Sequence, residues 1–140
     1  MPRRDTYHDA VRTALETDGW TITDDPLSVQ TPGTEFQIDL AAERTIILAE
    51  KAGEQIAVEI KSLISHTIFY DYYRGLGQFL VYRIALELVF PEKTLFLAIP
   101  KDAYEQLKKS YAFRESWPRY AVNLLIFNHK RKNIVKWIRF

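Results

Sequence analysis

The sequence predicts one α/β domain, residues 1–140, in which helices flank a central mixed β-sheet. The length of 140 residues is typical of a single domain. Hydrophobic residues make up 47% of the chain and charged residues 26%, as in ordinary globular proteins. Helical and strand-like patterns alternate without an internal repeat or a long linker. We therefore expect the order αβββαβ, followed by a further helix and C-terminal strands.

The first half of the chain predicts one helix followed by strands. Apolar residues recur at helical spacing in residues 5–18, and Gly19 follows as a stop signal. The expected extended segments are residues 20–22, 27–30, 36–40, 45–50 and 55–61. Residues 51–54 contain glycine and are expected to form a turn, so the last two segments are expected to pair as a hairpin.

The second half predicts a long helix, a buried strand, a short helix and two final strands. Residues 67–90 lack proline and are followed by Pro91, which predicts a helix of several turns. Gly75 and Gly77 weaken its early part by about 1 kcal/mol each and are expected to permit close packing. The remaining elements are a strand at 94–99, a helix at 101–111, and strands at 122–127 and 133–138.

Cysteine is absent, which excludes disulfides, cysteine-bound zinc and cysteine nucleophiles. The charged amino terminus has no apolar signal core, and no stretch approaches the roughly 20 apolar residues of a membrane helix. A cytoplasmic protein that does not cross a membrane is the expectation.

Charge is divided unevenly along the chain. Residues 1–60 carry five Lys and Arg against twelve Asp and Glu, a balance of −7, whereas residues 101–140 carry ten against three, a balance of +7. A carboxylate-rich half beside a basic third suits a metal site next to a DNA-binding surface, although solvated surface charge explains the same counts. The candidate phosphate-contacting residues are Lys108, Lys109, Arg114, Arg119, Lys130, Arg131 and Lys132.

The strand at residues 55–61 carries the main candidate site. Strand alternation directs Ala57, Glu59 and Lys61 to one face, so a carboxylate and an ammonium group lie side by side. Burying such charges costs several kcal/mol unless they are paired or bind a ligand. A surface Glu-Lys pair is the simpler alternative for the triplet alone.

A divalent metal ion needs more than one carboxylate. Asp39 is the expected second ligand, Glu50 is its rival, and the carbonyl of Ile60 could complete the set around Mg²⁺ or Mn²⁺. Beside this ion, Lys61 could orient or deprotonate a water that attacks a phosphodiester. The pattern thus favours metal-dependent hydrolysis of DNA.

Three further side chains are candidates near this site. Gln78 and Tyr82 lie one helical turn apart and carry polar groups that suit a phosphate, although a core tyrosine and a capping glutamine are the alternative. His8, in the first helix, could lean toward the carboxylates. An aromatic group suits base stacking, a core or an oligomer contact, and it comprises Phe69, Tyr70, Tyr72 and Tyr73.

The order of a helix, Asp39, the segment VEIKS at residues 58–62 and a helix with Q-x-x-x-Y at 78–82 resembles the PD-(D/E)XK nuclease superfamily. More closely, the chain resembles the XisH family, the fdxN element excision controlling factors. This likeness rests on YHDAV at 7–11, DGW at 18–20, DL at 39–40, AE at 42–43, IAVEIKS at 56–62, GQ at 77–78, YR at 82–83, IV at 134–135 and WI at 137–138.

The resemblance implies a restriction-endonuclease-like fold, removal of a DNA element and a partner of the XisI family. It assigns metal binding to Asp39 and Glu59 and the catalytic lysine to Lys61. Two functions stay open: a metal-dependent nuclease, or a non-cutting module that binds DNA or a partner and positions a site-specific recombinase. A toxin-antitoxin-like pair is a third reading. Exposed aromatic residues would also allow a homodimer.

Overall fold

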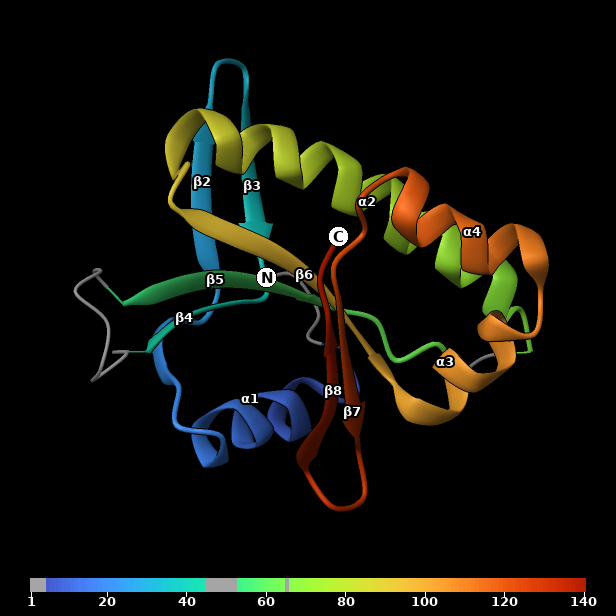
Figure 1. The fold of residues 1–140 in the computed structure, drawn as a ribbon. Helices are drawn as coiled ribbons and strands as arrows, with labels where there is room; N and C mark the ends of the chain where they lie inside the picture. The colour runs from blue at the N-terminus through green and yellow to red at the C-terminus, as the bar shows by residue number, and fades with distance from the viewer. Residues whose placement is uncertain (1–4, 45–52, 65) are drawn as a thin grey trace.

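The computed structural model describes residues 5–44, 53–64 and 66–140 and contains helices on both faces of a mixed sheet (Figure 1). The helices are α1 (His8–Thr17), α2 (Ile68–Val89), α3 (Lys101–Lys108) and α4 (Tyr111–Arg119). The strands are β1 (Thr21–Asp24), β2 (Leu27–Thr31), β3 (Thr34–Ile38), β4 (Leu40–Arg44), β5 (Glu54–Ile60), β6 (Lys93–Pro100), β7 (Leu124–Asn128) and β8 (Asn133–Ile138).

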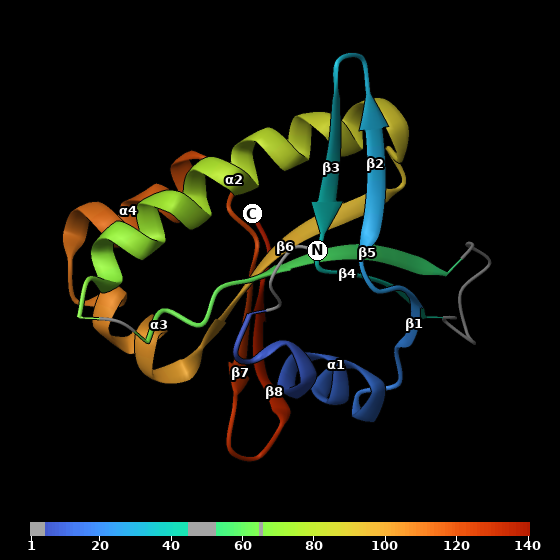
Figure 2. The ribbon, with the colours of Figure 1, turned by 180° about the vertical axis from the view of Figure 1, so that it is seen from behind.

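The central sheet has the strand order β1-β4-β5-β6-β7-β8. The pairs β5–β6 and β6–β7 are parallel and the other pairs are antiparallel, so the sheet is mixed, as the sequence predicts. Strands β2 and β3 form a separate two-stranded sheet. This hairpin stands against α2, which is plain from both sides of the molecule (Figures 1 and 2).

Strand β5 is buried on both faces, and its alternation separates two apolar clusters. Ile56, Val58 and Ile60 belong to the cluster that includes residues of α1. Ala57 belongs to the larger cluster, which includes residues of α2, α3, α4 and the β2–β3 hairpin. Because neighbouring strand residues point to opposite faces, Glu59 and Lys61 share the face of Ala57, as expected from the sequence, and α2 covers that face.

Most of the expected elements are present, with three differences. The extended segment at 36–40 is interrupted at Asp39, where β3 ends and β4 begins one residue later. The segment 45–50, expected to pair with β5, lies outside the described residues, and the antiparallel partner of β5 is β4. Helix α4 was not expected, because its only buried residue is Trp117 and it contains Pro118, so its sequence lacks an apolar periodicity.

Within the described residues, no helix combines the length and the apolar character that crossing a membrane requires.

Candidate functional site

Asp39 and Glu59 meet where β4 begins and β5 ends. Strand β4 pairs with β5 in an antiparallel register that sets Leu40 opposite Val58, so the next pair outward is Asp39 and Glu59. The Asp39 carboxylate accepts a hydrogen bond from the Ile60 backbone N–H at 2.8 Å, and the Asp39 N–H donates to Glu59 Oε1 at 3.4 Å. The structure therefore brings together two carboxylates that are 20 residues apart.

Glu59 lies in an electrostatically unfavourable place for an anion. Only 5% of the residue is exposed. Burial, followed by the nearby charge of Asp39, raises the pKa of Glu59 to about 8, and the Lys61 ammonium only partly opposes this. A cation placed between the two carboxylates would remove their repulsion.

Lys61 is held beside Glu59 by its backbone and by its stem. Its backbone N–H donates to the Ala98 carbonyl of β6 at 2.9 Å. Its Nζ lies 3.6 Å from Glu59 Oε2. Helix α2 approaches the stem closely at Gly75, where an added Cβ would lie only 3.2 Å from Lys61 Cγ. The close packing expected of the glycines occurs at Gly75, whereas a Cβ at Gly77 would meet nothing within 4 Å.

The two glycines form a matched pair for testing this contact. Gly77→Ala is expected to raise the free energy of unfolding by up to about 1 kcal/mol, because alanine has the higher helix propensity. Gly75→Ala should gain clearly less, because the stem of Lys61 must move aside. Urea unfolding of both variants measures the difference. Equal gains would show that the stem is free to shift.

Tyr82 and Gln78 lie on the same flank of α2 at different depths. Tyr82 is half-buried and packs edge-on against Phe36 of the hairpin, with ring centroids 5.6 Å apart. Burial and the charges of Glu59 and Asp39 raise the pKa of Tyr82 to about 12, so its hydroxyl keeps its proton. Gln78, one turn earlier, is exposed. Tyr82 is therefore near the carboxylates, with Gln78 at the surface above.

The carboxylates provide a small but adequate set of oxygen donors for a magnesium-like ion. Within residues 5–44, 53–64 and 66–140, no three His, Asp or Glu side chains gather as a metal site. Mg²⁺ is commonly held by one or two carboxylates together with waters and substrate phosphates, so the pair Asp39 and Glu59 fits the ligands that this ion takes. The Ile60 carbonyl points to the same side of β5 as its N–H, which faces Asp39. Glu50, the rival ligand, lies outside the described residues.

Comparison with known proteins gives the family. The family model described as XisH protein matches residues 1–135. This chain belongs to the XisH family. Among solved structures, an XisH family protein from Nostoc punctiforme is 36% identical with a TM-score of 0.87, and the match covers 96% of this chain and 100% of that one.

A second XisH-like structure supports the same fold. An fdxN element excision controlling factor protein from Anabaena variabilis is 35% identical with a TM-score of 0.86, over 97% of this chain and 100% of that one. A comparison with curated proteins gives no match.

His8 is not part of the carboxylate group in this XisH chain. It is buried in α1, and its Nε2 lies 2.7 Å from Asp25 Oδ1. Arg12 Nη1 donates to the other oxygen of Asp25 at 2.6 Å. Helix α1 packs on the sheet face opposite α2 (Figure 1), and Lys61 contacts α2 at Gly75, so His8 lies across the sheet from Lys61. Its contacts join α1 to the loop before β2.

Asp5 is a residue near the site that the sequence patterns did not single out. Its Oδ2 accepts a hydrogen bond from the Ser62 N–H at 2.9 Å, and its Oδ1 accepts one from the Tyr7 N–H at 2.9 Å. It thereby fixes the chain directly after Lys61. An acidic residue just before a helix was the available signal, because such residues often bond nearby backbone N–H groups.

The basic residue candidates divide into two groups. Lys108, Lys109, Arg114 and Arg119 belong to the α3–α4 region, whereas Lys130, Arg131 and Lys132 form the turn between β7 and β8. All seven are exposed. The turn follows the carboxyl end of β7, and parallel strands end at one sheet edge, so it shares an edge with the end of β5.

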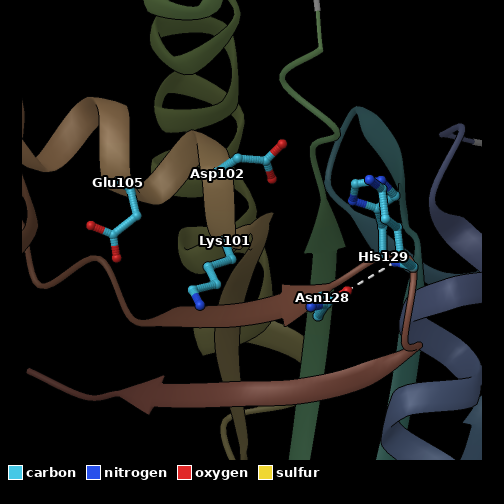
Figure 3. A pocket seen from close by; sticks show the side chains of 6 residues that line it. Lys101, Asp102, Glu105, Asn128 and His129 are labelled. Carbon is cyan, nitrogen blue, oxygen red and sulfur yellow. Dashed lines mark hydrogen bonds between the residues drawn. The ribbon is translucent and has the colours of Figure 1, made fainter.

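A pocket links this turn to the start of α3 (Figure 3). It has a volume of about 430 Å³ and is lined by Lys101, Asp102, Glu105, Asn128, His129 and Lys130. Its three basic or potentially basic side chains face two acidic ones, so its charge is mixed. The pocket lies beside the ends of β6 and β7, on the side of the sheet edge away from Asp39 and Glu59.

Proposed function

We propose that this XisH-family protein is a PD-(D/E)XK-type nuclease that hydrolyses DNA phosphodiesters with a divalent metal ion. The supporting observation is the group formed by Asp39, Glu59 and Lys61, with Lys61 Nζ 3.6 Å from Glu59 and the two carboxylates linked through backbone N–H groups. A structural sheet needs no buried carboxylate in β5 with a second, half-buried carboxylate at the start of β4 beside it, because burying such a charge is costly. A bound cation would offset the cost of holding the two carboxylates together.

Each residue has a distinct role in this proposal. Asp39, Glu59 and the Ile60 carbonyl would hold Mg²⁺ or Mn²⁺. When bound, the ion would supply Lewis acidity and would lower the pKa of a coordinated water. Lys61, fixed by Gly75 and Ala98, would orient the attacking water or donate to a phosphate oxygen. Tyr82, whose hydroxyl stays protonated, and the exposed Gln78 would donate hydrogen bonds to the DNA backbone.

The basic groups would guide the DNA. The turn with Lys130, Arg131 and Lys132 lies at the sheet edge that β5 also reaches, so phosphates could follow this edge. Residues of α3 and α4 would extend the contact. The relative described as an fdxN element excision controlling factor supports a role in controlling excision of a DNA element. The family resemblance adds a partner of the XisI family.

A second function is a non-cutting module that positions a site-specific recombinase. It is favoured by the hydrogen bonds that the carboxylates make with backbone N–H groups, because these could serve only to join β3, β4 and β5. It is also favoured by the small number of side-chain ligands among the described residues. The two functions differ in whether the site binds a metal ion.

Calorimetric titration with Mn²⁺ distinguishes them. The wild-type protein and Glu43→Ala, which removes an exposed acid from β4, are expected to bind with equal affinity. Glu59→Ala is expected to weaken binding by at least about 100-fold, because it removes one of two carboxylate ligands. Plasmid cleavage would then be measured with the same three proteins. No binding to the wild-type protein would reject the nuclease and favour the recombinase-positioning module.

A further inference from the structure

Helix α2 is apolar on the side that faces solvent as well as on the side that faces the sheet. Its 22 residues bury Tyr72, Phe79 and Leu86. On the outer side, Ile84 is 66% exposed and Leu88 63% exposed. A helix that is apolar all round is normally covered on all sides, and monomeric proteins rarely expose such continuous apolar surface. The outer side of α2 is therefore a candidate contact surface.

Six of the exposed residues of α2 form one uncharged stripe, here called the α2 stripe. It comprises Tyr70, Tyr73, Gly77, Val81, Ile84 and Leu88. The steps between them are three, four, four, three and four residues, the spacing that keeps side chains on one helix face. This is the spacing of residues that join two helices side by side. The exposed charged residues of α2, Arg74 and Glu87, lie at the two edges of the stripe.

We propose that the α2 stripe binds the same stripe of a second copy of this chain, with the two helices antiparallel about a two-fold axis level with the midpoint between Leu80 and Val81. Counting equal numbers of residues from this axis sets Gly77 of one copy opposite Ile84 of the other, and Tyr73 opposite Leu88. The space above Gly77 is open, with nothing within 4 Å of an added Cβ. A large side chain thus meets the only small residue of the stripe.

This fit favours a second copy over an unrelated partner. A two-fold interface requires one surface to complement itself, and a stripe that pairs small with large residues about its own centre meets that requirement. A helix of 22 residues is about 33 Å long and 10 Å wide, so pairing buries roughly 330 Å² per copy. Stable dimers bury about 800 Å² per partner, so the pairing should be weak and depend on concentration.

The pairing leaves the carboxylate site open. At about 100° per residue, Gln78 lies roughly a quarter turn around α2 from the middle of the stripe, and Tyr82 lies further round, toward Asp39 and Glu59. The two-fold axis of an antiparallel pair is perpendicular to both helices. The equivalent flanks of the two helices therefore lie on the same side of the dimer, which places both sites on one face.

Sedimentation equilibrium tests the association. The wild-type protein is expected to have a mass near 16.4 kDa at low concentration that rises toward twice this value at several hundred micromolar. Ile84→Glu should weaken association at least about tenfold, because it places a charge at the centre of the contact. Val135→Glu, which changes another exposed aliphatic residue on β8, should associate like the wild type. A wild-type protein that stays monomeric would overturn the proposal and leave the stripe to a different partner.

Cross-linking tests the direction of the helices and does not depend on Ile84→Glu folding. The chain has no cysteine, so single cysteines can be introduced without background. Oxidation of a mixture of Tyr73→Cys and Leu88→Cys should form mixed dimers, whereas Tyr73→Cys alone should not. Efficient cross-linking of Tyr73→Cys alone would show a parallel pairing, and cross-linking in neither sample would show that the stripe is not the contact. Each result would overturn the proposal independently of DNA cleavage.

Discussion

Replacement of Lys61 by methionine is expected to reduce Mn²⁺-dependent cleavage of plasmid DNA by about 10²- to 10⁴-fold, the usual contribution of a positioned acid or base. Methionine keeps an unbranched stem against Gly75 but removes the ammonium group beside Glu59. The initial rate at which supercoiled plasmid disappears measures the effect. Mn²⁺ affinity should change much less than the rate, because Lys61 is not a ligand in the proposed site.

Lys93→Met is the matched control. Lys93 is also a partly buried lysine of the sheet, hydrogen-bonded to Gln55 at 3.2 Å, but it lies at the opposite end of the parallel strands. The Lys93→Met variant should cleave plasmid DNA at the wild-type rate. If Lys61→Met retained more than about a third of the wild-type rate, Lys61 would have no catalytic role, whatever the Mn²⁺ titration gave.

Glu59→Gln is expected to stabilise the metal-free protein above pH 8 by an amount on the order of a few kcal/mol. Burial raises the pKa of Glu59 from its ordinary value of 4.5 to about 8. The folded protein therefore retains a proton that the unfolded chain loses as the pH rises through 4.5. Stability attributable to Glu59 is full below pH 4.5 and decreases up to about pH 8.

Urea unfolding between pH 4 and pH 9, with a chelator present, measures this dependence. Glutamine retains the oxygen that accepts the Asp39 N–H, so the main change is the loss of ionisation. The difference between Glu59→Gln and wild type should be small at pH 4 and grow toward pH 8. Glu43→Gln, an exposed residue of β4, should follow the wild-type profile. A constant difference at every pH would show that Glu59 ionises as easily as a surface carboxylate.

The long apolar elements of the fold could be predicted from the sequence. The helix expected at residues 67–90 is α2, and the segments 94–99, 122–127 and 133–138 are β6, β7 and β8 with boundaries that differ by at most two residues. Their signals are local: a continuous apolar run, a proline that ends a helix, or a basic turn between two strands. Such signals do not depend on distant contacts.

The less regular parts could not be predicted. Residues 36–40 read as one extended segment, but Ile38 pairs with Leu27 in the hairpin and Leu40 pairs with Val58 in the central sheet. Only the different strands with which Ile38 and Leu40 pair show that these residues belong to separate sheets. Helix α4 was not predicted because only one of its residues, Trp117, is buried, and a single apolar position produces no helical periodicity.

The site was partly predictable for a related reason. Strand alternation alone places Glu59 and Lys61 on one face, and the order of the segments suggested that Asp39 reaches them. The link between His8 and Asp25 was not predictable, because it joins residues 17 apart through a loop with no regular pattern. Metal binding and the catalytic role of these residues remain predictions.

The interruption between β3 and β4 at Asp39 gives the two carboxylates unequal mechanical support. Glu59 belongs to a strand enclosed by neighbours on both sides, whereas Asp39 is the joint between the central sheet and the projecting β2–β3 hairpin. The hairpin leans on α2 partly through Phe36 and Tyr82. A force on its exposed tip would therefore reach Asp39 first. It would reach Glu59 only through the hydrogen bonds that Asp39 makes with Glu59 and with the Ile60 N–H.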